Sequence, residues 1–148
     1  MEERFEHFTL LITQIGRYIR RIKSEAMAEF DLKSTHLSCI YYLYKKGSLT
    51  ATELCEMCDE DKASISRSMV YLEKNGYIVC DTKAKKRYKS QVELTDKGKK
   101  VGSMIAVKVE EMLNAASQGM SDDERTVMYR TLTIISNNLR DICENHSE

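Results

Sequence analysis

Apolar residues recur along the chain at two different spacings. Over residues 3–28, and again after Ser121, they alternate three and four positions apart, as in helices that lie along other helices. After Gly76 the spacing becomes two over residues 77–80 and 90–94, which is typical of half-buried strands. The pattern therefore predicts a mainly helical chain with one β-hairpin.

Capping signals divide the helical part into six helices. Thr50 with Glu53, and Ser121 with Glu124, have the spacing of capping boxes, in which each side chain binds the backbone amide of the other residue. The other boundary signals are N-caps at Ser34 and Thr95 and helix ends at Gly47 and Asn75-Gly76.

The third and fourth helices, joined by the acidic turn 59–61, predict a helix-turn-helix. On the fourth helix Ile65, Met69 and Leu72 share one side, which we expect to pack. The opposite side carries Arg67 among small residues, so the backbone could approach a base edge closely. There Arg67 could donate two hydrogen bonds to guanine. The alternative is an ordinary solvated helix surface.

A basic hairpin follows directly. Five of the seven residues 83–89 are Lys or Arg, with no acid among them. Beside a helix-turn-helix such a tip would be a wing lying near the minor groove and phosphates, whereas alone it would be read as a solvated loop.

The helices at both ends of the chain carry stripes of apolar residues, and one small winged helix does not need this much apolar surface for its own core. We therefore expect a homodimer whose interlocked terminal helices hold two recognition helices about 34 Å apart, with packing within one chain as the alternative. The residues expected at this interface are apolar: Phe5, Phe8, Ile12, Met128, Leu132, Ile135, Leu139 and Ile142.

Three stretches resemble the MarR family of bacterial transcription regulators. They are "LTATELCE" (49–56), "KASISRSMVYLEKNGYI" (62–78) and "VELTDKGKK" (92–100). The resemblance covers nearly the whole chain and implies one mainly α MarR-type domain with a small β wing over residues 1–148. It would hold a winged helix at about 34–95, a helix-turn-helix at about 50–74, and dimerisation helices at about 3–28 and 96–144. It also implies an obligate dimer, often a repressor of its own operon.

The resemblance also implies which residues contact DNA. The recognition positions fall on Ala63, Ser64, Ser66, Arg67 and Ser68, the wing positions on Lys85, Lys86 and Arg87, and we add Thr50 and Thr52 from the preceding helix. The family's wing commonly carries an Asp-x-Arg pair, but here those positions read Lys86 and Tyr88. We choose Arg87 as the residue that enters the minor groove.

A small aromatic effector would lie, by the same resemblance, between the dimer helices and the winged helix. The candidate lining residues are Tyr18, His36, Cys39, Tyr41 and Tyr42. For each of them ordinary core or interface packing is the alternative, and no particular ligand follows.

Composition adds limits. The 148 residues carry no net charge, so bulk charge does not indicate nucleic-acid binding and only its distribution does. No apolar run is long enough for a membrane span and the N-terminus lacks a secretory pattern, so we expect a cytoplasmic protein.

The five cysteines form an odd set without a disulfide framework, which favours reduced thiols. Cys55 and Cys58 have redox spacing, but the C-terminal end of a helix disfavours a thiolate. The histidines show no ligand spacing with them, so neither a metal nor another cofactor is expected.

We therefore interpret the sequence as a DNA-binding transcriptional regulator, a homodimeric repressor of a pseudo-palindromic operator that a small molecule could release. The alternatives are a winged helix that contacts an acidic protein and a redox- or metal-responsive regulator that uses its cysteines. Since the chain has no nucleophile beside a base and no glycine-rich phosphate loop, we do not expect an enzyme.

Overall fold

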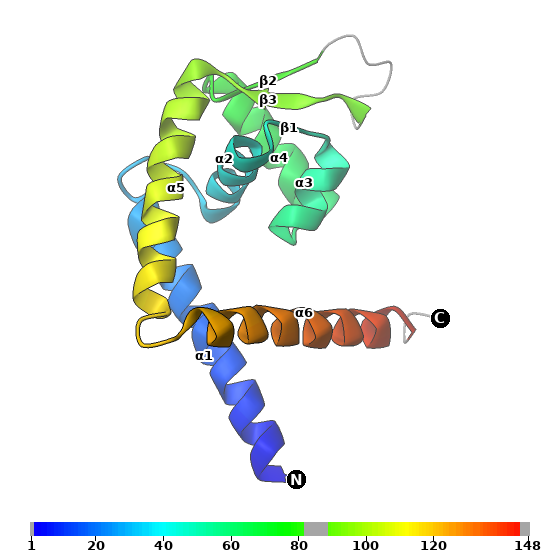
Figure 1. Ribbon diagram of the computed structural model, residues 1–148. Coiled ribbons are helices and arrows are strands. Elements are labelled where there is room, and N and C mark those ends of the chain that lie inside the picture. The colour runs from blue at the N-terminus through cyan, green and yellow to red at the C-terminus, as the bar shows by residue number, and fades with distance from the viewer. Residues whose placement is uncertain (1, 82–88, 146–148) are drawn as a thin grey trace. The chain divides into compact units, whose positions relative to one another are not determined.

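The computed structural model describes residues 2–81 and 89–145, and the chain divides into two compact units, residues 1–108 and 109–148. Figure 1 shows the elements, which in chain order are α1 (Glu2–Met27), α2 (Ser34–Lys46), β1 (Ser48–Leu49), α3 (Ala51–Cys58), α4 (Lys62–Lys74), β2 (Ile78–Cys80), β3 (Val92–Leu94), α5 (Asp96–Ala116) and α6 (Asp122–Asn145). The predicted fold class, mainly α with a small β wing, is confirmed. No helix of the described part is long and apolar enough to cross a membrane.

The core of the first unit lies among α2, α3 and α4. Its largest buried side chains include Ile40 and Leu43 of α2, Leu54 of α3, and Ile65 and Leu72 of α4. Each side chain of this size contributes about 1.5–3 kcal/mol when it leaves water. The helix-turn-helix is therefore held on a rigid base.

Most of the predicted helix boundaries are confirmed. The Thr50 hydroxyl accepts the Glu53 amide at 3.3 Å, and the Glu53 carboxylate accepts the Thr50 amide at 2.7 Å. Gly76 ends α4 with a positive φ of 75°. The expected Ser34 cap is wrong by one residue, because Lys33 is the N-cap of α2 and its amide donates to Nδ1 of His36 at 3.1 Å.

The sheet has the antiparallel order β1-β3-β2. β2 and β3 form the expected hairpin, with Ile78 opposite Leu94 and Cys80 opposite Val92. β1 was not predicted, since two residues are too short to show a period. It pairs with β3 through Leu49 opposite Val92 and closes the sheet over the core.

The first turn of α5 is fastened to the turn that ends α4. The Thr95 hydroxyl accepts the Gly98 amide at 3.1 Å, which confirms the predicted cap, and donates to the Gly76 carbonyl at 2.6 Å. Lys97 donates to the Asn75 carbonyl at 2.8 Å. These contacts fix where the chain leaves the wing.

The second unit contains the end of α5 and the whole of α6. The predicted capping box starts α6, with the Ser121 amide donating to the Glu124 carboxylate at 2.8 Å; this hydrogen bond lowers the pKa of Glu124. None of the described residues of α6 is buried. Its apolar stripe is uncovered: Leu132, Leu139 and Ile142 are exposed, and Met128 and Ile135 are half-buried.

Candidate nucleic-acid interface

The helix α4 has one packed face and one open face. Ile65, Met69 and Leu72 are at most 5% exposed, which confirms the predicted packed side. The predicted contact residues Ala63, Ser66 and Arg67 lie on the exposed side, together with Val70, which is 51% exposed. An open helix face that carries one arginine among small side chains can approach a nucleic-acid groove closely.

The start of α4 is held by Asp61, which is its N-cap. The Asp61 carboxylate accepts the backbone amide of Ser64 at 2.7 Å. This bond orients the first turn, where Ser64 itself is half-buried. Of the three predicted serines, Ser66 is the one that is exposed.

Ser68 does not lie on the open face. The Ser68 side chain lies on the packed face of α4 and is only 5% exposed, so the prediction that it contacts DNA is corrected. Residues three and four apart share a helix side, and Ser68 stands three after Ile65 and four before Leu72. Both of those neighbours are core residues.

The two threonines of the preceding segment differ in their availability. Thr50 is occupied as the N-cap of α3, and its hydroxyl lies 3.0 Å from the Glu53 carboxylate. Thr52, two residues further along, is exposed. Thr52 is therefore the threonine that a ligand could reach.

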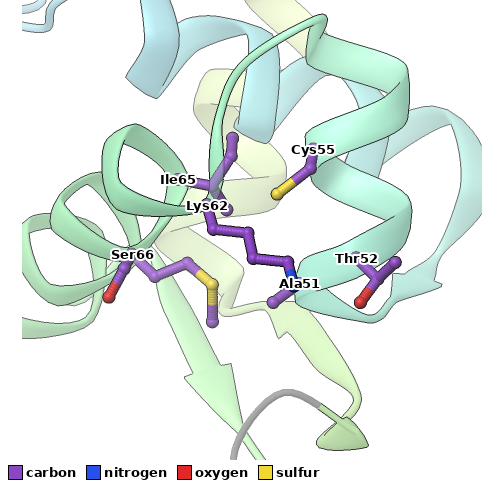
Figure 2. Close-up of a pocket in the computed structure, with 7 residues that line it drawn as sticks. Ala51, Thr52, Cys55, Lys62, Ile65 and Ser66 are labelled. Carbon is purple, nitrogen blue, oxygen red and sulfur yellow. The ribbon is translucent and has the colours of Figure 1, made fainter. Parts of the chain in front are cut away.

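A cavity of about 410 Å³ lies between α3 and α4 (Figure 2). Its walls are residues of both helices: Ala51, Thr52, Cys55, Lys62, Ile65, Ser66 and Met69. Burial raises the pKa of the Cys55 thiol, so this wall carries a neutral sulfur rather than a thiolate. The charged group of the cavity is thus the Lys62 ammonium.

Lys62 was missed by the sequence interpretation. Figure 2 shows its side chain extending across the cavity toward Ala51, the first residue of α3. The signal that could have revealed it is its position, because the first turn of a helix disfavours a cation and α4 carries no acid within that turn. A cation at this position is available for an anionic contact outside the protein.

The predicted wing contacts Lys85, Lys86 and Arg87 lie outside the described residues. What the structure describes is the base of the wing. There the Ser90 hydroxyl donates to the Asp81 carbonyl, and the Asp81 amide donates to the Gln91 carbonyl at 2.9 Å. The base of the hairpin is therefore closed by hydrogen bonds on both strands.

One of the five predicted effector-lining residues, His36, lines a cavity of about 660 Å³. This cavity is bounded by Ser24, Ala28, Asp31, Leu32, Lys33, Ser34, His36 and Tyr71. The His36 ring stacks on Tyr71 with 4.3 Å between centroids, and burial, followed by the nearby Lys33 charge, lowers the pKa of His36.

The other four lie elsewhere. Tyr18 is 52% exposed on α1, and Tyr41 and Tyr42 form an edge-to-face pair at 5.3 Å. Burial raises the pKa of Tyr42. Cys39 is fully buried, so the expectation that it lines an open pocket is corrected. Its neighbour explains why: Sγ of Cys39 contacts Sγ of Cys58 at 4.0 Å in the packing of α2 against α3.

A short capped helix, a tight turn, an exposed second helix and a hairpin directly after it define a winged helix-turn-helix. Residues 35–113, more than half of the chain, match the family of winged helix DNA-binding domains. Among curated proteins, none matches the sequence significantly. The chain belongs to the family of winged helix DNA-binding domains, which bind DNA and are not enzymes.

Solved structures share this fold over most of the chain. A MarR family regulator from Neisseria meningitidis superposes with a TM-score of 0.81 at 20% identity, covering 96% of this chain and 98% of that one. A MarR family regulator from Listeria monocytogenes in complex with a 26-mer DNA gives 0.77 at 23% identity, covering 88% and 87%. MepR of S. aureus, in its DNA-binding conformation, gives 0.81 at 19% identity, covering 89% and 98%. The fold is that of MarR family transcriptional regulators.

Proposed function

We propose that this chain is a sequence-specific transcriptional regulator that binds double-stranded DNA by inserting α4 into the major groove. The observation that carries the proposal is the open face of α4, with Arg67 among small side chains above a fully packed face. A helix can read bases only if its backbone comes near the groove floor. Small residues on that face permit this approach.

Base readout is assigned to Arg67 and its apolar neighbours. An arginine recognises guanine through two parallel hydrogen bonds to N7 and O6. Ala63 and Val70 present methyl groups that suit the C5-methyl of thymine, which accounts for an exposed valine on a polar face. Arg67 is thus expected to contribute more discrimination than any other described residue.

Phosphate contacts are assigned to Lys62, to Thr52 and to the wing residues Lys85, Lys86 and Arg87. Lys62 extends toward the N-terminus of α3, where the helix dipole also favours an anion (Figure 2). Such contacts position the protein on DNA without reading sequence. They also make affinity depend on salt.

The regulator is proposed to act as a homodimer on a pseudo-palindromic operator. The support is the apolar surface of the terminal helices: Phe5, Phe8 and Ile12 of α1 are exposed, as are Leu132, Leu139 and Ile142 of α6. Exposed apolar stripes of this length usually mark an interface. Two protomers would present two α4 helices about one DNA turn apart.

Repression and its release by a small molecule complete the proposal. The cavity of about 660 Å³ beside His36 and Tyr71 is large enough for a small aromatic compound, and a stacked ring pair forms part of its wall. A ligand that binds one arrangement of this cavity better would shift the protein toward it and change DNA affinity.

The proposal is tested by footprinting the purified protein on the DNA upstream of its own gene. We expect two protected half-sites about one helical turn apart and an affinity that falls steeply with salt. Absence of protection, together with capture of an acidic protein by the same surface, would instead support the protein-contact alternative.

A further inference from the structure

Cys39 and Cys58 are brought together although they are far apart in the sequence. Cys39 belongs to α2 and Cys58 is the last residue of α3, and their sulfur atoms lie 4.0 Å apart. No group of three or more metal-binding side chains occurs in the described ranges, so this thiol pair lacks the further ligands of a metal site. We infer that the two thiols are a modification site, oxidised by peroxide to a disulfide that regulates DNA binding.

The two sulfurs differ in a way that assigns their roles. Cys39 is fully buried, whereas Cys58 is only half-buried and is thus the one that an oxidant can reach. The contact with Cys39 lowers the pKa of Cys58, as does Lys23 of α1, whereas burial and the Glu60 charge act in the opposite direction. The same contact, followed by burial, raises the pKa of Cys39, so Cys58 is the more readily deprotonated of the two thiols.

The reaction follows from these roles. The C-terminal end of α3 disfavours a thiolate at Cys58, and the contact with Cys39 opposes this effect. The Cys58 thiolate attacks one oxygen of a hydroperoxide, the O–O bond breaks, and Cys58 becomes a sulfenic acid while the other peroxide oxygen leaves as hydroxide or alkoxide. The Cys39 thiol then attacks the oxidised sulfur, an S–S bond forms, and the sulfenic oxygen leaves as water with the Cys39 proton. Two electrons pass from the thiols to the peroxide.

The position of Cys58 couples this bond to the recognition helix. A disulfide requires its sulfurs about 2 Å apart, so closure must draw the end of α3 toward α2. Cys58 is followed by Asp59, the C-cap of α3 with a φ of 52°, and then by the residues that begin α4. Glu60 in this turn accepts the Thr35 hydroxyl at 3.1 Å, and Asp61 caps α4 through Ser64. Movement of this turn therefore changes the position and orientation of α4.

Oxidation is expected to weaken operator binding, and this regulatory step rests on the proposed function. Coupled sites in proteins typically change affinity by about 5- to 150-fold. We expect a loss within this range on oxidation, reversed by a thiol reductant. The disulfide itself does not depend on DNA binding and can be tested separately.

The first experiment treats the native, full-length protein with hydrogen peroxide and maps its tryptic peptides by mass spectrometry. Cys39 lies on one tryptic peptide, but Cys55 and Cys58 share another, so the cross-link is mapped in parallel in Cys55→Ser and Cys58→Ser. We expect the cross-link in the wild type and in Cys55→Ser and its absence in Cys58→Ser. Cys58 sulfinic acid without a cross-link, or a cross-link retained in Cys58→Ser, would overturn the inference.

The second experiment measures operator affinity before and after peroxide, with thermal unfolding as the check on folding. Wild type and Cys55→Ser should lose affinity and regain it with reductant, whereas Cys58→Ser should keep it. A disulfide that forms without changing affinity would overturn the regulatory step. Failure of the reduced wild type to bind DNA would refute the proposed function instead, with the mapped disulfide unaffected.

Discussion

Gly98 lies so close to Tyr77 that a Cβ atom built on residue 98 would stand 2.0 Å from the Tyr77 carbonyl oxygen. The first turn of α5 therefore rests directly on the backbone that links α4 to the wing. The same carbonyl accepts the Thr95 amide at 3.1 Å, so it is fixed and cannot easily retreat. This close approach explains physically why a glycine stands three residues after Thr95.

Gly98→Ala is accordingly expected to destabilise the protein by about 1–3 kcal/mol, the usual cost of overpacking a close-packed site. Urea unfolding would measure it as a lower midpoint. Gly16→Ala is the matched control, because its Cβ would meet only the end of the Arg20 side chain, at 3.5 Å. There the change should stabilise α1 by about 0.5–1 kcal/mol. Equal effects at the two sites would contradict the packing argument.

The elements that the sequence could predict are those defined by local interactions. The capping boxes at Thr50 and Ser121 each involve residues three apart, and the packed side of α4 follows from the helical period of Ile65, Met69 and Leu72. Each of these signals comes from residues of a single helix. The predictions based on them therefore did not depend on contacts between distant segments of the chain.

What the sequence could not predict depends on contacts between distant segments. β1 is a strand only because it pairs with β3, and the neighbour of Cys58 is Cys39 on another helix rather than Cys55 on its own. The burial of Ser68 is a different case, because helical periodicity does indicate it: Ser68 stands three residues after Ile65 and four before Leu72. Its assignment to DNA came from the family resemblance and not from this period.

Arg67→Ala is expected to weaken operator binding by about 1–3 kcal/mol and to relax the preference at one base position. The variant loses two hydrogen bonds to one guanine. Because these bonds contact a single base, the preference at the other positions of the operator should not change. Binding titrations against an operator and its single-base variants would measure both effects. An unchanged preference at every position would remove Arg67 from base readout.

Lys62→Ala should weaken binding nearly equally on all sequences, because a phosphate contact carries no sequence information. The slope of log affinity against log salt should become shallower by about one unit, as one fewer phosphate is neutralised. Lys100→Ala removes the same charge from an exposed position of α5, outside the helix-turn-helix, and should leave the slope unchanged. If both variants shift the slope alike, general charge rather than the cavity position of Lys62 is responsible.

Leu132→Asp should convert the proposed dimer into a monomer. Leu132 is exposed on the apolar stripe of α6, and burying an unpaired carboxylate in an apolar interface costs several kcal/mol, of order 2–7 even for a neutral polar group. Light scattering after size exclusion would report the mass, and operator binding should be lost with the dimer. Asn137→Asp adds the same charge at an exposed polar position on the opposite side of α6 and should remain dimeric. A folded Leu132→Asp protein that is still dimeric would place the interface elsewhere.

His36 is expected to make the protein less stable as the solution becomes acidic. Its pKa in the folded state is lowered, first by burial and then by the Lys33 charge, and its neutral Nδ1 accepts the Lys33 amide. Below about pH 6.5 an unfolded histidine binds a proton while the folded His36 still resists it. Unfolding then takes up a proton, so stability falls as the pH decreases toward the folded pKa and is fully present above about 6.5.

Measuring the urea midpoint of the wild type and of His36→Asn between neutral and mildly acidic pH isolates this contribution. An asparagine can still accept the Lys33 amide through its side-chain oxygen but does not titrate, so the variant should lose part of the pH dependence. Its stability at neutral pH should also drop, because the stacking on Tyr71 at 4.3 Å is lost, and the slope rather than the absolute midpoint is therefore the informative quantity. Identical slopes in the two proteins would show that protonation of His36 is not linked to unfolding.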